Sequence, residues 1–281
     1  MYIYFAESLN AITLGYWGKR TATLDWCEEN YVVCKYIAEF HNTLTNAVFV
    51  LLALYGLHTV KKLKMETRFL TSFGTFMMVG IGSWCFHMTL LYEMQLLDEL
   101  PMLFATCVLI YSVFETKETS IYGWKFPVLL FVIATLISTI YILVKSPLFH
   151  QLSYGCLTAV LVFRALYLFI SLPSGPAKRS MQRLLITSWG SYALGFLAWN
   201  IDNEFCPQIR AARAYLGSPW DSLLQLHGWW HILTGLGSYV YIVFSQYIRQ
   251  IQLGKKDLYT IHWTMGVLPT VALANGKPKL V

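Results

Sequence analysis

Seven stretches of the chain are each apolar over nearly the length that a helix needs to cross a bilayer, which is about 20 residues. Charged residues make up only 13% of the chain, whereas a soluble domain usually carries about 25%. We therefore predict an all-α integral membrane protein, a seven-transmembrane helix bundle whose short links make successive helices antiparallel neighbours. The predicted spans are residues 42–60, 69–91, 97–114, 124–144, 151–170, 184–203 and 223–248.

These spans divide the chain into three parts, which are an amino-terminal segment (1–41), the helix bundle (42–248) and a tail (249–281). The first ten residues lack the basic and apolar regions of a secretory signal, so we expect the first span to direct membrane insertion.

Lys and Arg residues predict the orientation, because they concentrate in cytoplasmic loops. With the amino terminus outside the cytosol, 14 of the 21 basic residues fall on the cytosolic side and six on the other. The net charge of +6 is moderate, and the positive residues fall in loops. This placement indicates membrane topology rather than nucleic-acid binding. The cytosolic residues are Lys61, Lys62, Lys64, Arg68, Lys117, Lys125, Lys178, Arg179, Arg183, Arg249, Lys255, Lys256, Lys277 and Lys279.

Ionisable side chains within predicted spans are costly in lipid and so indicate function. His87 lies near the outer end of the second span, and Asp98 opens the third span on the same side. His227 and His231 stand four residues apart in the first two turns of the seventh span, which also begins outside. Four ionisable side chains from three helices are thus predicted to share one depth.

This set has the residue types of a catalytic zinc site, which keeps three protein ligands and an open position for water. Residues at i and i+4 of a helix lie on one face, so His227 and His231 suit one ion that His87 approaches from a neighbouring helix. Zinc lowers the pKa of a bound water to about 7 and polarises a carbonyl. Asp98 suits a general base, and the hydroxyl of Ser83, four residues before His87, suits an oxyanion donor.

Each of these residues also has a structural interpretation. A single histidine in a span is usually a packing residue, but the spaced pair with a third at matching depth favours a metal. Asp98 could instead cap the third helix, and Ser83 could serve close helix contact. A structural zinc site usually has four protein ligands, often cysteines, whereas the cysteines within spans are scattered and are interpreted as packing residues. They are Cys85, Cys107 and Cys156.

An acidic stretch, TLDWCEENYVVCKYIAEF, precedes the first span on the outer side. Calcium takes six to eight oxygen ligands, commonly including backbone carbonyls, so the stretch suits a calcium site, although a solvated acidic loop is the alternative. Cys27 and Cys206 are both predicted on the outer side, where a disulfide is favoured, and Cys34 is a competing partner. The candidate oxygen donors are Asp25, Glu28, Glu29, Asn30 and Glu39.

Several long runs of the sequence resemble the alkaline ceramidase family. That family belongs to a wider superfamily of seven-helix hydrolases that includes the adiponectin receptors. The resemblance covers about residues 15–248 but not the loop 207–222 or the tail. The runs are GYWG, TLDWCEENY, YIAEF, GSWCFHMTL, YEMQLLDELPM, AWNIDN and HGWWHILTG.

The resemblance implies an integral membrane amidase that cleaves ceramides into a sphingoid base and a fatty acid, in the endoplasmic reticulum or Golgi membrane with the amino terminus lumenal and the carboxyl terminus cytosolic. It implies that His87, His227 and His231 bind zinc, that Asp98 shuttles the proton and that Ser83 supports the oxyanion. It also implies a disulfide between Cys27 and Cys206 and a regulatory calcium site. The implied calcium ligands are Asp25, the carbonyl of Trp26, Glu28, Asn30 and Glu39.

Two other functions remain open at this point. A receptor would use the same metal and signal through ligand-driven helix movement, and a transporter would use the Asp and His residues as a proton relay. A transporter further predicts inverted repeats, none of which is apparent, and neither alternative explains the acidic stretch. Asp202 and Asn203 in AWNIDN either support the site or tie helices together.

Overall fold

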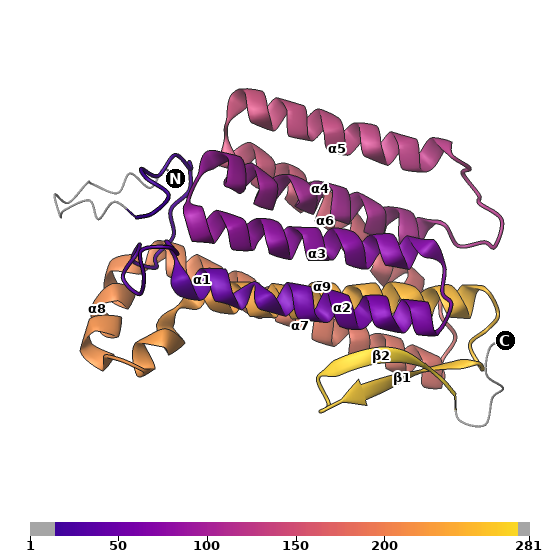
Figure 1. Cartoon of the computed structure of the whole chain (residues 1–281). Helices are drawn as coiled ribbons and strands as arrows, with labels where there is room; N and C mark the ends of the chain where they lie inside the picture. The colour runs from indigo at the N-terminus through magenta and orange to yellow at the C-terminus, as the bar shows by residue number, and fades with distance from the viewer. Residues whose placement is uncertain (1–14, 275–281) are drawn as a thin grey trace.

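The computed structural model describes residues 15–274. The stretch assessed for a signal, together with Lys277 and Lys279, lies outside the described residues. Long helices lie side by side as a bundle, with residues 15–39 and a short helix at one end and a β-hairpin beside the other (Figure 1). We call these the amino end and the carboxyl end of the bundle.

The predicted bundle is confirmed, with shifts in the helix bounds, the largest at α7, which begins at Pro176 and not at residue 184. The helices are α1 (Phe40–Thr45), α2 (Ala47–Lys62), α3 (Thr67–Thr89), α4 (Tyr92–Phe114), α5 (Lys125–Val144), α6 (Pro147–Ile170), α7 (Pro176–Glu204), α8 (Cys206–Leu216) and α9 (Leu226–Gln252), with a 3-10 turn η1 (Trp220–Leu224) before α9.

Five of these segments are long and apolar enough to cross a membrane, namely α1 with α2 as one span, α3, α4, α5 and α6. Helices α7 and α9 are longer, with 29 and 27 residues, but more polar. Helix α9 is sheltered, because it contacts α1, α2, α3, α4 and α7 and is buried without a break from Tyr239 to Gln250. Its polar residues therefore face protein, which lowers the cost of their presence at membrane depth.

Tight links make α4 and α6 begin earlier than predicted, at Tyr92 and Pro147. Helix α3 ends at Thr89, the left-handed backbone of Leu90 (φ 52°) turns the chain, and α4 begins at Tyr92. Asp98 therefore lies in the second turn of α4, and the interpretation of Asp98 as a helix cap is wrong. Similarly, the Ser146 hydroxyl caps α6 by accepting from the Phe149 N–H at 3.4 Å, and Pro147 occupies the first helical position.

The tail after α9 forms a hairpin that was not predicted from the sequence. Strands β1 (Tyr259–Thr264) and β2 (Leu268–Leu273) pair antiparallel and contact α2 and α9. The Tyr239 hydroxyl, midway along α9, donates to the Pro269 carbonyl at 2.8 Å in a buried position. The hairpin covers part of α9 and so accounts for some of that helix's unbroken burial.

Candidate functional site

Three imidazoles meet at the amino end of the bundle. His87 lies in the last turn of α3, and His227 and His231 lie in the first two turns of α9. One ligand atom of each lies within 4.8 Å of the others, and the ring centroids are 4.7–5.1 Å apart. All three rings are buried. The shared depth that the sequence predicts is therefore realised as direct proximity.

Neighbouring side chains occupy one nitrogen on two of these rings. Nδ1 of His87 donates to the Glu39 carboxylate, and Nδ1 of His231 lies 3.0 Å from the Thr45 hydroxyl. These contacts leave Nε2 of His87 and of His231 free to bind a metal ion. In metal-binding histidines the ring nitrogen that does not bind the metal usually contacts a neighbouring protein group in this way. Nδ1 of His227 is buried and has no partner among the residues that the structure describes. The donor set of three imidazoles fits zinc.

The imidazoles line a cavity of about 700 Å³ that Ser83 and Asp98 also line. Ser83 of α3 and Asp98 of α4 are neighbours where these two helices pack against each other. Gly82 permits this approach, because a Cβ there would lie 2.1 Å from the Leu97 carbonyl oxygen. The structure thus brings both predicted side chains to the wall that holds the imidazoles.

The rest of the cavity wall is mainly apolar, and the cavity reaches the bundle surface between α6 and α7. Leu148 and Leu152 of α6 and Phe196 of α7 line it, and each is more than half exposed (62%, 62% and 56%). An apolar chain could therefore enter from the side while a polar group lies beside the imidazoles.

The acidic stretch TLDWCEENYVVCKYIAEF, called the acidic segment from here on, wraps around the start of α1, beside the imidazoles. The Glu28 carboxylate accepts from the backbone N–H groups of His41 and Asn42 at 2.7 and 2.9 Å, which satisfies donors that the helix start leaves free. Glu39 is fully buried and accepts from the Trp26 N–H at 3.3 Å. Burial, and secondarily the nearby Asp25 carboxylate, raise the pKa of Glu39 well above its usual range.

The predicted calcium ligands are neighbours but are not as tightly gathered as the imidazoles. Asn30 donates to the Asp25 carboxylate at 3.2 Å, and Asp25 also pairs with Arg20 at 2.8 Å. The side-chain oxygen of Asn30 is buried without a partner in the described part of the chain. Within residues 15–274, only the imidazoles bring three ligand atoms within 4.8 Å of one another. The unpartnered Asn30 oxygen and the nearby carboxylates fit the oxygen preference of calcium.

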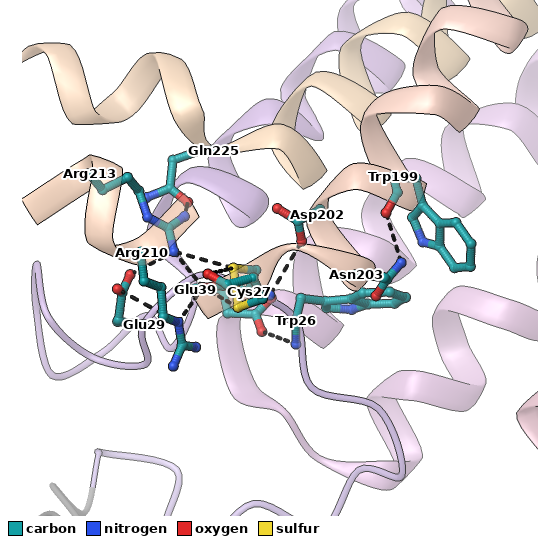
Figure 2. The surroundings of a disulfide bond; sticks show 11 residues. Trp26, Cys27, Glu29, Glu39, Trp199, Asp202, Asn203, Arg210, Arg213 and Gln225 are labelled. Carbon is teal, nitrogen blue, oxygen red and sulfur yellow. Dashed lines mark hydrogen bonds and ion pairs between the residues drawn. A yellow bond between two sulfur atoms is a disulfide. The ribbon is translucent and has the colours of Figure 1, made fainter. Parts of the chain in front are cut away.

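The disulfide between Cys27 and Cys206 is present and ties the acidic segment to the start of α8 (Figure 2). Cys34, the competing partner, is free. The ring of Trp26, next to Cys27, stacks on His227 with centroids 4.1 Å apart. The acidic segment thus contacts two imidazoles, through Glu39 and through Trp26.

Asp202 supports this arrangement, whereas Asn203 does not. The buried Asp202 carboxylate accepts from the Cys27 N–H at 3.4 Å (Figure 2). It therefore joins the acidic segment to the last turns of α7. Asn203 donates to the Trp199 carbonyl at 2.8 Å within its own helix.

Sequence reasoning missed a second polar group on the cavity wall. Glu99 and His150 both line the cavity, and Glu99 is nearly buried (7%). The predicted spans leave His150 in a link, whereas it lies in the first turn of α6. Two signals were available, because Glu99 adjoins Asp98 and His150 begins a helix at the same end of the bundle.

Comparison with known proteins finds similarity over nearly the whole chain. A family model described as Ceramidase matches residues 18–272. The chain is 43% identical to alkaline ceramidase 3 of Mus musculus, over 92% of this chain and 94% of the relative. It is 40% identical to alkaline ceramidase YPC1 of Saccharomyces cerevisiae, over 94% and 88%, and 29% identical to alkaline ceramidase of Arabidopsis thaliana, over 94% and 96%.

Proposed function

Because the chain belongs to the ceramidase family, we propose that it hydrolyses the N-acyl amide bond of ceramides and releases a sphingoid base and a free fatty acid. The substrate is ceramide, dihydroceramide or phytoceramide. The observation that carries this proposal is the buried imidazole trio on the wall of a mainly apolar cavity that reaches the bundle surface.

In this proposal His87, His227 and His231 hold a catalytic zinc ion. A bound zinc supplies a water of lowered pKa and polarises the amide carbonyl. Glu39 and Thr45 orient two of the rings by contacting Nδ1. Such outer contacts raise the basicity of the ligand and keep the ring in one orientation.

Asp98 and Ser83 supply the remaining chemistry. The Asp98 carboxylate accepts a proton from the attacking water and returns it to the leaving amine, which would otherwise depart as an unstable anion. The Ser83 hydroxyl donates a hydrogen bond to the oxygen that becomes negative as the carbonyl is attacked. The packing of α3 against α4 keeps both groups on one side of the cavity.

The cavity suits a lipid with a polar amide and two chains. Its apolar walls accept hydrocarbon, and the opening between α6 and α7 lets the chains remain partly in the membrane. The amide then reaches the imidazoles near one membrane surface, so the enzyme need not extract its substrate from the bilayer.

We further propose that calcium binds the acidic segment and tunes activity. The ligands are Asp25, the Trp26 carbonyl, Glu28, Asn30 and Glu39. Support comes from the buried Asn30 oxygen and from the contacts of Glu39 with His87 and of Trp26 with His227. A cation that orders this segment would therefore order two zinc ligands.

The proposed location is the membrane of the endoplasmic reticulum or Golgi, with the amino end of the bundle lumenal and the tail cytosolic. The disulfide supports an oxidising compartment for that end.

The test is to purify the protein in detergent, measure bound zinc and assay sphingoid-base release from defined ceramides with and without calcium. We expect about one zinc per chain, hydrolysis that chelation abolishes and zinc restores, and higher activity with calcium. Zinc-loaded protein that hydrolyses none of the three ceramide classes would refute the proposal and favour the receptor function.

A further inference from the structure

A second polar cluster lies on the cavity wall away from the imidazoles. It brings together α4, α5 and α6, whereas the imidazoles come from α3 and α9. The Glu99 carboxylate accepts at Oε2 from the Tyr141 hydroxyl and, at 3.0 Å, from the Gln95 amide. Gln95 in turn bonds with Thr23 of the amino-terminal segment at 2.8 Å. The orientation of the carboxylate is therefore held from two sides.

The protonation of His150 follows from its contacts. Its Nε2 lies 3.0 Å from the backbone carbonyl oxygen of Glu99, and a carbonyl can only accept. Nε2 therefore carries the hydrogen, and in the neutral ring Nδ1 is an acceptor. Nδ1 lies 3.8 Å from Glu99 Oε1, too far for a direct hydrogen bond. Within residues 15–274, neither His150 Nδ1 nor Glu99 Oε1 has a hydrogen bond, because the bonds of these two residues use the other ring nitrogen and the other carboxylate oxygen.

Glu99 Oε1 and His150 Nδ1 thus lie side by side on the wall of the cavity. Both are acceptors, so neither can donate a hydrogen bond to the other. An unpaired acceptor in a low-dielectric site is costly, so the pair favours a ligand that brings hydrogen-bond donors. A ceramide carries its donors unevenly. The sphingoid half has hydroxyl groups on carbons 1 and 3, and the saturated acyl half has none beyond the shared amide.

The position along α4 agrees with this chemistry. Asp98 and Glu99 are consecutive and both line the cavity. The leaving nitrogen, which Asp98 protonates, is bonded to carbon 2 of the sphingoid base, and the hydroxyls are on the two carbons next to it. Neighbouring groups of the substrate would therefore meet neighbouring residues of the protein.

We propose that Glu99 Oε1 and His150 Nδ1 form the subsite that binds the hydroxyl groups of the sphingoid base and so selects its head group. This inference rests on the proposed ceramide hydrolysis. It makes Glu99 and His150 specificity residues, distinct from the groups that act on the amide.

The test compares N-acylsphinganine with its 1-deoxy and 3-deoxy analogues. For the wild-type enzyme, kcat/KM should fall by roughly tenfold or more on at least one analogue, the range for a hydrogen bond to a charged group. In Glu99→Gln the side-chain amide can donate to His150, so the pair of acceptors is lost. The kcat/KM values of this variant for N-acylsphinganine and for the deoxy analogues should therefore agree within about threefold. The matched control is Glu93→Gln, an exposed glutamate on the same helix, which should keep the wild-type discrimination.

A merely structural role for Glu99 would lower the rates on all three substrates equally, and unchanged discrimination in the variant would overturn the proposal. So would a wild-type enzyme that does not distinguish the substrates. His150→Phe, which removes the second acceptor, provides an independent variant if Glu99→Gln does not fold.

Binding of the free base separates this inference from the proposed function. Sphinganine should raise the melting temperature of the zinc-loaded wild type more than its 1-deoxy or 3-deoxy analogue does, and Glu99→Gln should lose that difference. A difference in binding without hydrolysis of any ceramide would support the subsite and refute the proposed reaction. Equal stabilisation by all three bases would refute the subsite.

Discussion

At the scale of single residues, each imidazole of the trio has a different neighbour. Glu39 contacts His87, Thr45 contacts His231, and the ring of Trp26 covers His227. The sequence indicated the histidines themselves, because ionisable groups stand out within apolar spans. It did not indicate which side chains orient them, since those contacts join residues up to 201 positions apart, as Trp26 and His227 are.

Replacing Glu39 by Gln should weaken zinc binding and remove the response to calcium. The variant loses the carboxylate that accepts from His87, and such outer contacts are worth roughly 10- to 100-fold in metal affinity or activity. Zinc affinity and sphingoid-base release, each with and without calcium, check this expectation.

The control is Glu204→Gln, which changes an exposed glutamate at the end of α7 on the same end of the bundle and should change both readouts little. A Glu39→Gln protein with normal zinc affinity and an unchanged calcium response would disprove the coupling.

At the scale of elements, α9 connects the site to the rest of the bundle. Its first turns hold two imidazoles, and its second half is buried against neighbouring helices and the hairpin. The hairpin is secured by Arg183 of α7, whose guanidinium lies 3.9 Å from the centre of the Trp263 ring and donates to the Gly266 carbonyl at 2.8 Å. The tail is therefore a packed part of the bundle.

Val271→Asp should destabilise the protein, because Val271 is 2% exposed within the core that α9 and the hairpin share. An uncompensated buried charge costs about 3 kcal/mol or more, so the melting temperature in detergent should fall clearly. Met265→Asp at the hairpin turn, where the side chain is 96% exposed, should have little effect. Equal melting temperatures for the two variants would show that the hairpin contributes no stability.

At the scale of the whole molecule, contacts between distant parts of the chain assemble the amino end of the bundle. The disulfide joins residues 179 positions apart, and Arg213 of α8 donates to the Cys27 carbonyl at 2.6 Å (Figure 2). Asp202 of α7 adds a further contact to the same cysteine. The acidic segment is thus held against α7 and α8.

Cys206→Ser should lower both stability and activity, because the acidic segment is then free to leave the imidazoles. Loss of a disulfide that closes a long loop costs about 2–4 kcal/mol. Melting temperature, zinc content and ceramide hydrolysis check this result. Cys34→Ser, which alters a free cysteine of the same segment, should behave like the wild type in all three. If both variants matched the wild type, the disulfide would have no role in the site.

The sequence by itself determined which segments form the long helices and at which end of the bundle His87, Asp98, His227 and His231 lie. Hydropathy and helix rise give the depth of a residue along its own helix, and the alternation of antiparallel spans gives the end at which it lies. Neither gives rotation about the helix axis or the choice of lateral neighbours. Only the tertiary structure decided the contact of Glu39 with His87, the facing acceptors of Glu99 and His150, and the packing of the hairpin on α9, because side-chain packing between distant segments sets all three.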